Sequence, residues 1–172
     1  MMYRSEWTNV PDPDALACYC GSDPSKAICM GVEPNADCKA LVDAVLPLAR
    51  QMLDRFGEFH PYGAAMGGDG KIAAVAIHEG RERPASIAVI RQLKTAFIAG
   101  AKERRFKATA LVYNVNITLP TNGQKSDAIA VSLNHRDGSS VKMLFPYRIV
   151  ENSVVIDQPF AQRGEADVFP LR

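Results

Sequence analysis

The first clear pattern along the chain is a run of apolar residues that recur every three or four positions between residues 37 and 56. This spacing lines one face of an amphipathic helix. Asn35 or Asp37 can cap the start of that helix, and Gly57 offers the left-handed stop that helices favour. Pro47 lies inside the pattern, so we expect it to kink or divide the helix.

A β-hairpin and a second helix are predicted next. Residues 62–66 and 71–77 flank the sequence G-G-D-G, whose residues tolerate the positive φ angles of tight turns. Because this glycine-rich segment connects two strands and does not open a helix, it indicates a hairpin turn and not a phosphate-binding loop. Pro84 suits the first turn of a helix, and an apolar face repeats through residues 87–101.

The period of the apolar pattern changes from 3.6 to 2 in the C-terminal half. Alternation over residues 109–119 predicts a long strand, and turn signals then separate further strands at 129–133, 140–147 and 154–157. Strands joined by short turns must be antiparallel. The predicted fold class is therefore α+β, with an antiparallel sheet, made of a β-hairpin and a C-terminal β-meander, and with two helices packed on one face.

The prolines and the turn residues of residues 1–36 set them apart from the rest. This segment shows no periodic apolar face, so we predict a loosely ordered leader. A second interpretation is that the natural protein starts at Met30. Residues 37–172 then form a single α+β domain, which agrees with the usual size of one domain.

The overall composition is that of an ordinary globular protein, with 47% hydrophobic and 23% charged residues and a formal net charge of +1. No apolar run is long enough to span a membrane and no secretory signal is visible, so we expect a cytoplasmic protein without a membrane partner. In a reducing compartment the four cysteines are expected to be free thiols, because their C-x-C-x8-C-x8-C spacing does not match zinc or iron–sulfur sites. We therefore expect no metal and no cofactor. The cysteines are Cys18, Cys20, Cys29 and Cys38.

Basic residues gather around the second helix, which raises the question of nucleic-acid binding. Nucleic-acid modules normally add exposed aromatic residues or a helix that reads a groove, and neither accompanies this patch. We interpret the patch as a solvated helix face and do not expect a nucleic-acid partner. Its members are Arg81, Arg83, Arg91, Lys102, Arg104, Arg105 and Lys107.

The candidate functional residues lie at the junction between the first helix and the hairpin. Glu58, His60 and Tyr62 alternate along an extended backbone, so their side chains are expected to project to the same side. Histidine changes charge near neutral pH, and a neighbouring carboxylate could tune it as a general base. Tyr147 and Arg148 complete the candidate binding set. The competing interpretation of the first three residues is a polar strand edge with ordinary hydrogen bonds.

Residues 57–64 read G-E-F-H-P-Y-G-A and precede the glycine-rich hairpin. This segment resembles the G-E-F-x-P-[FY]-G-A signature of a family of small uncharacterised bacterial proteins. The later Pro146-Tyr147-Arg148 resembles a second recurring P-Y-R feature of the same family. The resemblance covers about residues 40–160, and it implies an α+β domain with no assigned activity.

The residues of the first motif also have structural interpretations. Gly57 ends the helix, Phe59 anchors the core and Pro61 stiffens the entry to the strand. Gly63 permits close packing. The motif therefore predicts architecture more directly than chemistry.

Two function hypotheses follow from the sequence. The leading one is a soluble, non-enzymatic binding or accessory module, immunity-like in kind, that contacts a protein partner through the open face or edge of its sheet. Homodimerisation through the same surface is equally compatible. The alternative is a small enzyme that binds a small anionic substrate near Glu58, His60, Tyr147 and Arg148.

Overall fold

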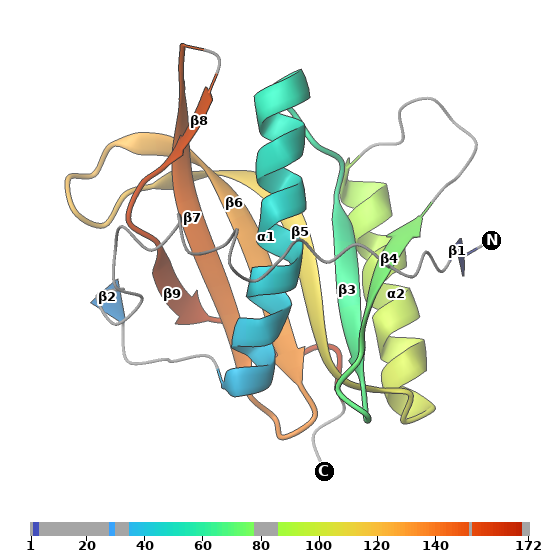
Figure 1. Cartoon of the computed structure of the whole chain (residues 1–172). Helices are drawn as coiled ribbons and strands as arrows, with labels where there is room; N and C mark the ends of the chain where they lie inside the picture. The colour runs from blue at the N-terminus through green and yellow to red at the C-terminus, as the bar shows by residue number, and fades with distance from the viewer. Residues whose placement is uncertain (1, 4–27, 30–34, 78–85, 152, 170–172) are drawn as a thin grey trace.

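A computed structural model of the chain describes residues 2–3, 28–29, 35–77, 86–151 and 153–169 (Figure 1). Apart from 2–3, 28–29 and 35–36, the predicted leader lies outside the described residues, and so does Pro84. The elements in chain order are β1 (Met2–Tyr3), β2 (Ile28–Cys29), α1 (Ala36–Phe56), β3 (Tyr62–Gly67), β4 (Ile72–Ile77), α2 (Ser86–Lys102), β5 (Phe106–Thr118), β6 (Lys125–His135), β7 (Ser140–Val150), β8 (Ser153–Ile156) and β9 (Phe160–Arg163).

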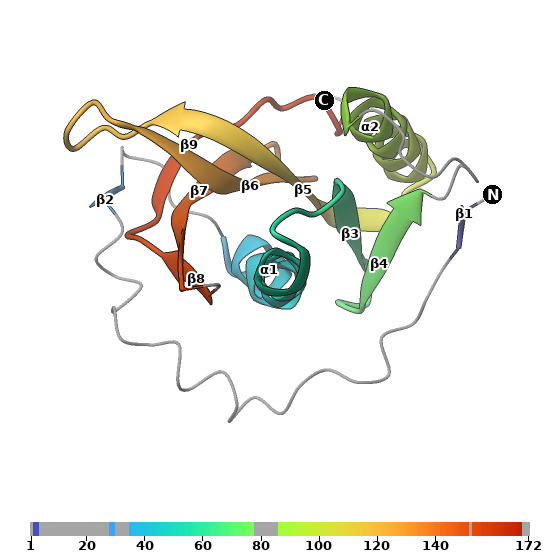
Figure 2. The same ribbon diagram turned by 90° about the horizontal axis from the view of Figure 1, so that it is seen from above.

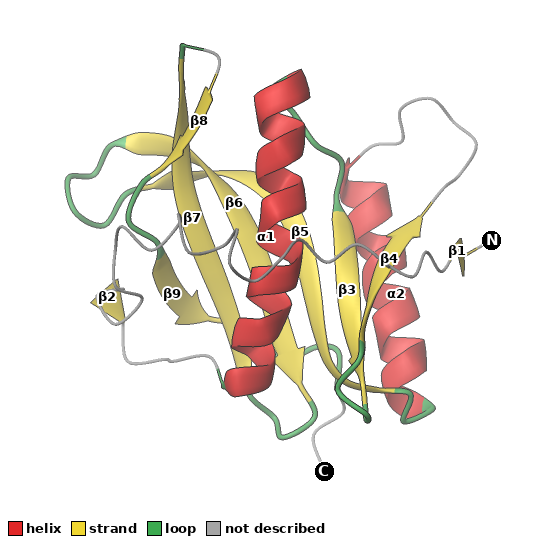
Figure 3. Ribbon diagram, viewed as in Figure 1, coloured by secondary structure: helices red, strands yellow, loops and turns green. Residues whose placement is uncertain are grey.

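The strands form one sheet with the order β1-β4-β3-β5-β6-β7-β9-β2, and β8 also pairs with β7 (Figure 3). All described pairings are antiparallel except that of the two-residue β2 with β9. The predicted α+β class, the β3–β4 hairpin and the meander from β5 to β8 are confirmed. β9 was not predicted; it pairs with β7 beside β8, on the same edge of that strand.

The first helix begins and ends where its capping residues require. The Asn35 side chain accepts a hydrogen bond from the Cys38 N–H at 2.9 Å, and Gly57 adopts φ +70° while its N–H donates to the Leu53 carbonyl. The predicted division at Pro47 does not occur, because α1 is assigned as one helix through that residue. No helix in the described part of the chain is long and apolar enough to cross a membrane.

The two helices pack on opposite faces of the sheet, so the prediction that both lie on one face is wrong. Successive strand residues point to opposite faces. In β5, Ala110 and Val112 belong to the core beneath α1, whereas Leu111 belongs to the core beneath α2. Figure 2 shows the sheet curling around α1, with α2 on the other side of the sheet.

The C-terminal residues extend the cover on the α2 side. Val168 and Phe169 are buried in the same cluster as the apolar face of α2. The Lys94 ammonium of α2 donates to Glu165 at 2.9 Å and to Asp167 at 2.6 Å. Each face of the sheet therefore carries one helix, and the expectation that one face is open is wrong.

Gly63 allows α2 to approach the sheet closely. An ideal Cβ at this position would lie 2.5 Å from Cζ of Phe97 and 2.7 Å from the carbonyl oxygen of Ala110. Real Cβ atoms do not approach other atoms so closely in a packed interior, so the side chain of Phe97 fills the space that a larger residue would need. The close packing predicted at Gly63 is confirmed.

We therefore expect Gly63→Ala to lower the free energy of unfolding by about 2–3 kcal/mol, because the new methyl group overpacks the core. Urea denaturation measures this change. Gly68→Ala in the adjoining turn is the matched control, since its Cβ would meet nothing within 4 Å. Equal effects of the two substitutions would contradict the packing interpretation.

Candidate functional site

The first three predicted site residues lie at the end of α1 and the start of β3, as expected. Glu58 and His60 are exposed, and neither forms a hydrogen bond or an ion pair within the described residues. Tyr62 is half-buried, and its hydroxyl donates to the Val45 carbonyl of α1 at 2.6 Å. Burial raises the pKa of Tyr62, so its hydroxyl stays protonated and fastens the helix to the sheet.

Tyr147 and Arg148 are consecutive in β7 and point to opposite faces. Tyr147 is buried on the α1 side, where its hydroxyl donates to Oδ1 of Asn114 at 3.2 Å. Burial raises the pKa of Tyr147, and the nearby Asp127 carboxylate acts in the same direction. The guanidinium of Arg148 is exposed and lies 3.5 Å from the Asp157 carboxylate.

The structure therefore does not bring the predicted set together at one site. Tyr62 packs against the α1-side core that contains Tyr147, whereas Arg148 lies on the other face of β7. Within the described residues no hydrogen bond or ion pair connects Glu58 or His60 to Tyr147. The enzyme alternative stays a prediction without a geometric observation in its favour.

A cavity of about 240 Å³ lies where the β5–β6 turn approaches the segment between β8 and β9. None of the five predicted residues contributes to its lining. The lining residues are Leu119, Pro120, Thr121, Asn122, Pro146, Asp157, Gln158, Pro159 and Phe160.

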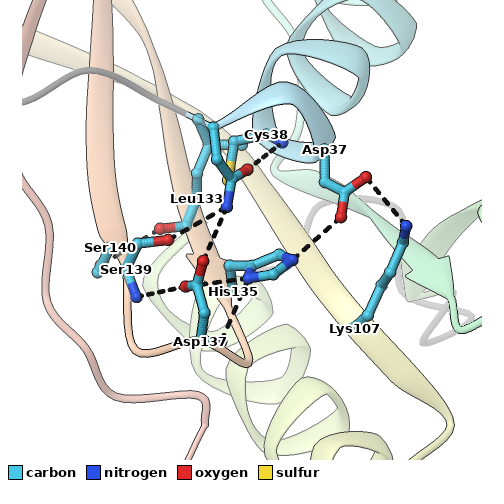
Figure 4. Close-up of polar contacts among 9 residues, drawn as sticks. Asp37, Cys38, Lys107, Leu133, His135, Asp137, Ser139 and Ser140 are labelled. Carbon is cyan, nitrogen blue, oxygen red and sulfur yellow. Dashed lines mark hydrogen bonds and ion pairs between the residues drawn. The ribbon is translucent and has the colours of Figure 1, made fainter.

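A second group of polar residues, which the sequence analysis did not propose as a site, joins the start of α1 to the sheet (Figure 4). Asp37 of α1 accepts a hydrogen bond from the Lys107 ammonium at 2.9 Å, and its other oxygen lies 3.1 Å from Nε2 of His135. Nδ1 of His135 lies 2.9 Å from Oδ1 of Asp137 and 3.2 Å from the Asp137 backbone N–H. We call Asn35, Asp37, Lys107, His135, Asp137 and Ser139 the polar cluster.

The remaining contacts of the polar cluster connect the helix cap to the β6–β7 turn. The Asn35 amide donates to Oδ2 of Asp137 at 3.2 Å and to Oγ of Ser139 at 3.4 Å. The Ser139 N–H donates to Oδ1 of Asp137 at 2.7 Å. Asn35 thus caps α1 and at the same time binds the turn that follows β6.

Charge interactions keep both carboxylates of the polar cluster ionised. The hydrogen bond from Lys107 holds the pKa of Asp37 below its usual value, although burial acts in the opposite direction. Burial also raises the pKa of Asp137, but the hydrogen bonds from Ser139 and the interaction with His135 outweigh it and lower that pKa overall. These carboxylates are therefore negative throughout the neutral range.

The polar cluster fastens the fold and does not present free catalytic groups. Both ring nitrogens of His135 contact protein atoms, so neither is free to form a hydrogen bond with a substrate. Burial raises the pKa of the neighbouring free thiol of Cys38 to about 11, so the thiolate nucleophile does not form near neutral pH. Within the described residues no group of three or more His, Cys, Asp or Glu side chains could hold a metal ion.

Sequence reasoning missed the polar cluster because its members come from distant segments. The sequence predicts only a capping role for Asp37. The separation of 98 residues between Asp37 and His135 leaves no periodic trace in the sequence. The H-x-D spacing of His135 and Asp137 at a hairpin was the one local signal that could have pointed to it.

Comparison with known proteins assigns no relatives to the chain. No family model matches it. No curated protein and no solved structure matches it either. The resemblance to small uncharacterised bacterial proteins therefore stays a prediction, and so does any function drawn from it.

The depressed pKa of Asp37 predicts how acid acts on stability. A carboxylate whose pKa is lower in the folded state stabilises that state above its ordinary pKa, near 3.8, and this stabilisation is lost as the pH falls below that value. We expect Asp37→Asn to lower the free energy of unfolding at pH 7 by about 1 kcal/mol, and to make its decline between pH 4 and pH 2 shallower than in the wild type.

Denaturant titrations at a series of pH values measure both effects. Glu58→Gln serves as the control, because the exposed Glu58 has no described partner. The acid response of Asp37→Asn should depart from that of the control. If the free energy of unfolding declined with acid equally in the wild type and in Asp37→Asn, the ion pair of Asp37 would not be the source of the acid sensitivity.

Proposed function

We propose that the chain is a non-enzymatic binding module that acts through protein–protein contact, and that the β7–β8 hairpin is its contact surface. The observation that carries this proposal is a pair of exposed apolar side chains on one face of this hairpin, where Val150 is 45% exposed and Val155 38%. Ile149 is 49% exposed but lies on the opposite face of the strand. Apolar side chains that gather on a surface, unlike scattered ones, are typical of interaction sites.

The register of the hairpin defines its contact face. Arg148 pairs with Val155 and Val150 pairs with Ser153, so the two valines and Arg148 share the face turned away from α1. The ion pair between Arg148 and Asp157 borders this face. An apolar centre with a polar border is the usual composition of a protein–protein contact.

Strand β8 of the hairpin is anchored to α1 close to the tip, which favours binding because less order must be gained on association. Val154 is buried, and its N–H donates to the Asp54 carboxylate of α1 at 2.7 Å. This contact occupies a backbone donor on β8 that could otherwise pair with a further strand. We therefore propose contact through the side chains of the hairpin face and not through addition of a strand.

Backbone strain at the hairpin tip also supports the proposal. Glu151 has φ +49°, in the left-handed region that costs an ordinary residue about 1–2 kcal/mol. Strained residues tend to persist where a binding surface requires their conformation.

The proposed partner is another protein in the cytoplasm, as an immunity-like module would have. A second copy of the chain is the other candidate for the same surface. Light scattering separates these two, because self-association would double the mass of the purified chain.

Removal of the strain at the tip should stabilise the protein. We expect Glu151→Gly to raise the free energy of unfolding by roughly 0.5–1 kcal/mol, since glycine adopts positive φ without steric cost but loses more chain entropy on folding. Thermal and urea denaturation measure the change. Ser153→Gly, at a paired strand position, is the control and should destabilise the protein. A loss of stability in Glu151→Gly would count against strain at the tip.

The contact itself is tested with Val155→Asp. A carboxylate buried against an apolar partner without compensation is costly, so recovery of the partner should fall at least about tenfold. The tagged chain is cross-linked in the organism that makes it, and proteins recovered with the wild type and with the variant are quantified by mass spectrometry.

Ile87→Asp is the matched control, because Ile87 is 66% exposed in the first turn of α2 and lies outside the hairpin. Unfolding curves verify that both variants fold. The proposal expects specific proteins to be lost with Val155→Asp and retained with Ile87→Asp. Equal recovery with both variants and the wild type would refute it.

A further inference from the structure

The environment of His135 is unusual because a carboxylate faces each nitrogen of the ring. Nε2 lies 3.1 Å from Oδ2 of Asp37, and Nδ1 lies 2.9 Å from Oδ1 of Asp137 (Figure 4). The side chain of His135 is only 11% exposed, so water screens these contacts weakly.

The protonation state of the ring decides whether both contacts are favourable. A carboxylate oxygen only accepts hydrogen bonds, and a neutral imidazole carries one N–H donor and one lone pair. Either neutral tautomer therefore turns a lone pair toward one of the two carboxylates. The imidazolium alone donates to Asp37 and Asp137 at the same time.

We propose that His135 is a pH-sensitive latch between the start of α1 and the β6–β7 turn. The latch is closed when the ring is protonated and donates to both carboxylates. Loss of the Nδ1 proton turns that nitrogen into an acceptor, which can take the Asp137 backbone N–H at 3.2 Å but repels the Asp137 carboxylate. The contact between the ring and the Asp137 carboxylate then opens.

The ring loses its contact with Asp137 and keeps its contact with Asp37 because the two carboxylates have different further partners. Asp37 remains held by the Lys107 ammonium at 2.9 Å and can still accept from Nε2. The other hydrogen bonds of the Asp137 carboxylate come from neutral groups, the Ser139 N–H and the Asn35 amide. Movement of this carboxylate therefore disturbs both of these contacts. Deprotonation of His135 thus loosens the turn at residues 136–139 and its attachment to the cap of α1.

The charged groups around the ring act in both directions. From α1, the Asp37 carboxylate favours the imidazolium, while the helix N-terminus disfavours it. From β5, the Lys107 ammonium disfavours it, although Asp37 lies between the two groups in contact with both. From the turn, the Asp137 carboxylate favours it, and the neighbouring Cys38 thiol remains neutral.

The latch goes beyond the proposed binding function and does not depend on it. The β6–β7 turn adjoins the start of β7, whereas the β7–β8 hairpin lies at the end of that strand. Loss of partner binding in a hairpin variant would leave the pH response of the turn unchanged.

Hydrogen exchange of the full chain tests the latch. Exchange of peptides that cover residues 133–141 is measured by mass spectrometry at pH 5.5 and pH 8, and corrected for the intrinsic pH dependence of amide exchange. Loss of one charge-assisted hydrogen bond changes the equilibrium constant for local opening about tenfold. We therefore expect about tenfold less protection of the Ser139 amide at pH 8. His135→Gln, which cannot be charged, should show no such change.

His60→Gln is the matched control, since His60 is exposed and should leave the wild-type response intact. Equal protection of the wild type at both pH values, or the same change in His135→Gln, would overturn the latch. If His135→Gln does not fold, ¹⁵N NMR of the wild type decides. The Ser139 amide shift must then follow the charge of the His135 ring, and a shift that does not follow it overturns the proposal.

Discussion

The structure depends on the close approach of two helices to opposite faces of one strand pair, β3 and β5. Small residues make this approach feasible, because any larger side chain at the crossing points would hold the helices away. Phe97 of α2 occupies the space over Gly63, while α1 packs over alanines on the other face. The remaining strands extend this central pair by pairing on either side. The small residues are Gly63, Ala64, Ala65, Ala108 and Ala110.

Local patterns predicted the elements well, and non-local contacts account for what was missed. The limits of α1, the β3–β4 hairpin and the strands of the meander follow from period, caps and turn residues. The side of the sheet taken by each helix depends on which strand positions face it. Ala110, Leu111 and Val112 are consecutive and all apolar, although neighbouring strand residues point to opposite faces. This pattern indicates a strand buried on both faces, whereas the predicted fold placed helices on one face only. Strand β9 is not predicted from the sequence because its four residues show no alternation of apolar and polar positions. They adopt a strand conformation by pairing with β7.

The candidate site shows the same division between local and distant information. Alternation correctly put Glu58, His60 and Tyr62 at the junction of helix and strand, but it could not tell which of them would be buried or bonded. Only Tyr62 acquires a described hydrogen bond, and it is structural. His135 has a far more constrained environment, yet its partner Asp37 lies 98 residues away, and only the fold brings the two together.

Polar contacts near both ends of α1 set its position along the sheet, while apolar packing between them supplies most of the adhesion. Burial of apolar surface is favourable but not directional, so it alone would allow the helix to slide or rotate over the alanine-rich strands. Asn35 and Asp37 fix the first turn to the β6–β7 turn, and Asp54 fixes the last turns to β8. Because β7 runs between these two attachments, the helix also positions the hairpin that presents Val150 and Val155. The same few hydrogen bonds that locate the helix therefore orient the exposed apolar face of the hairpin.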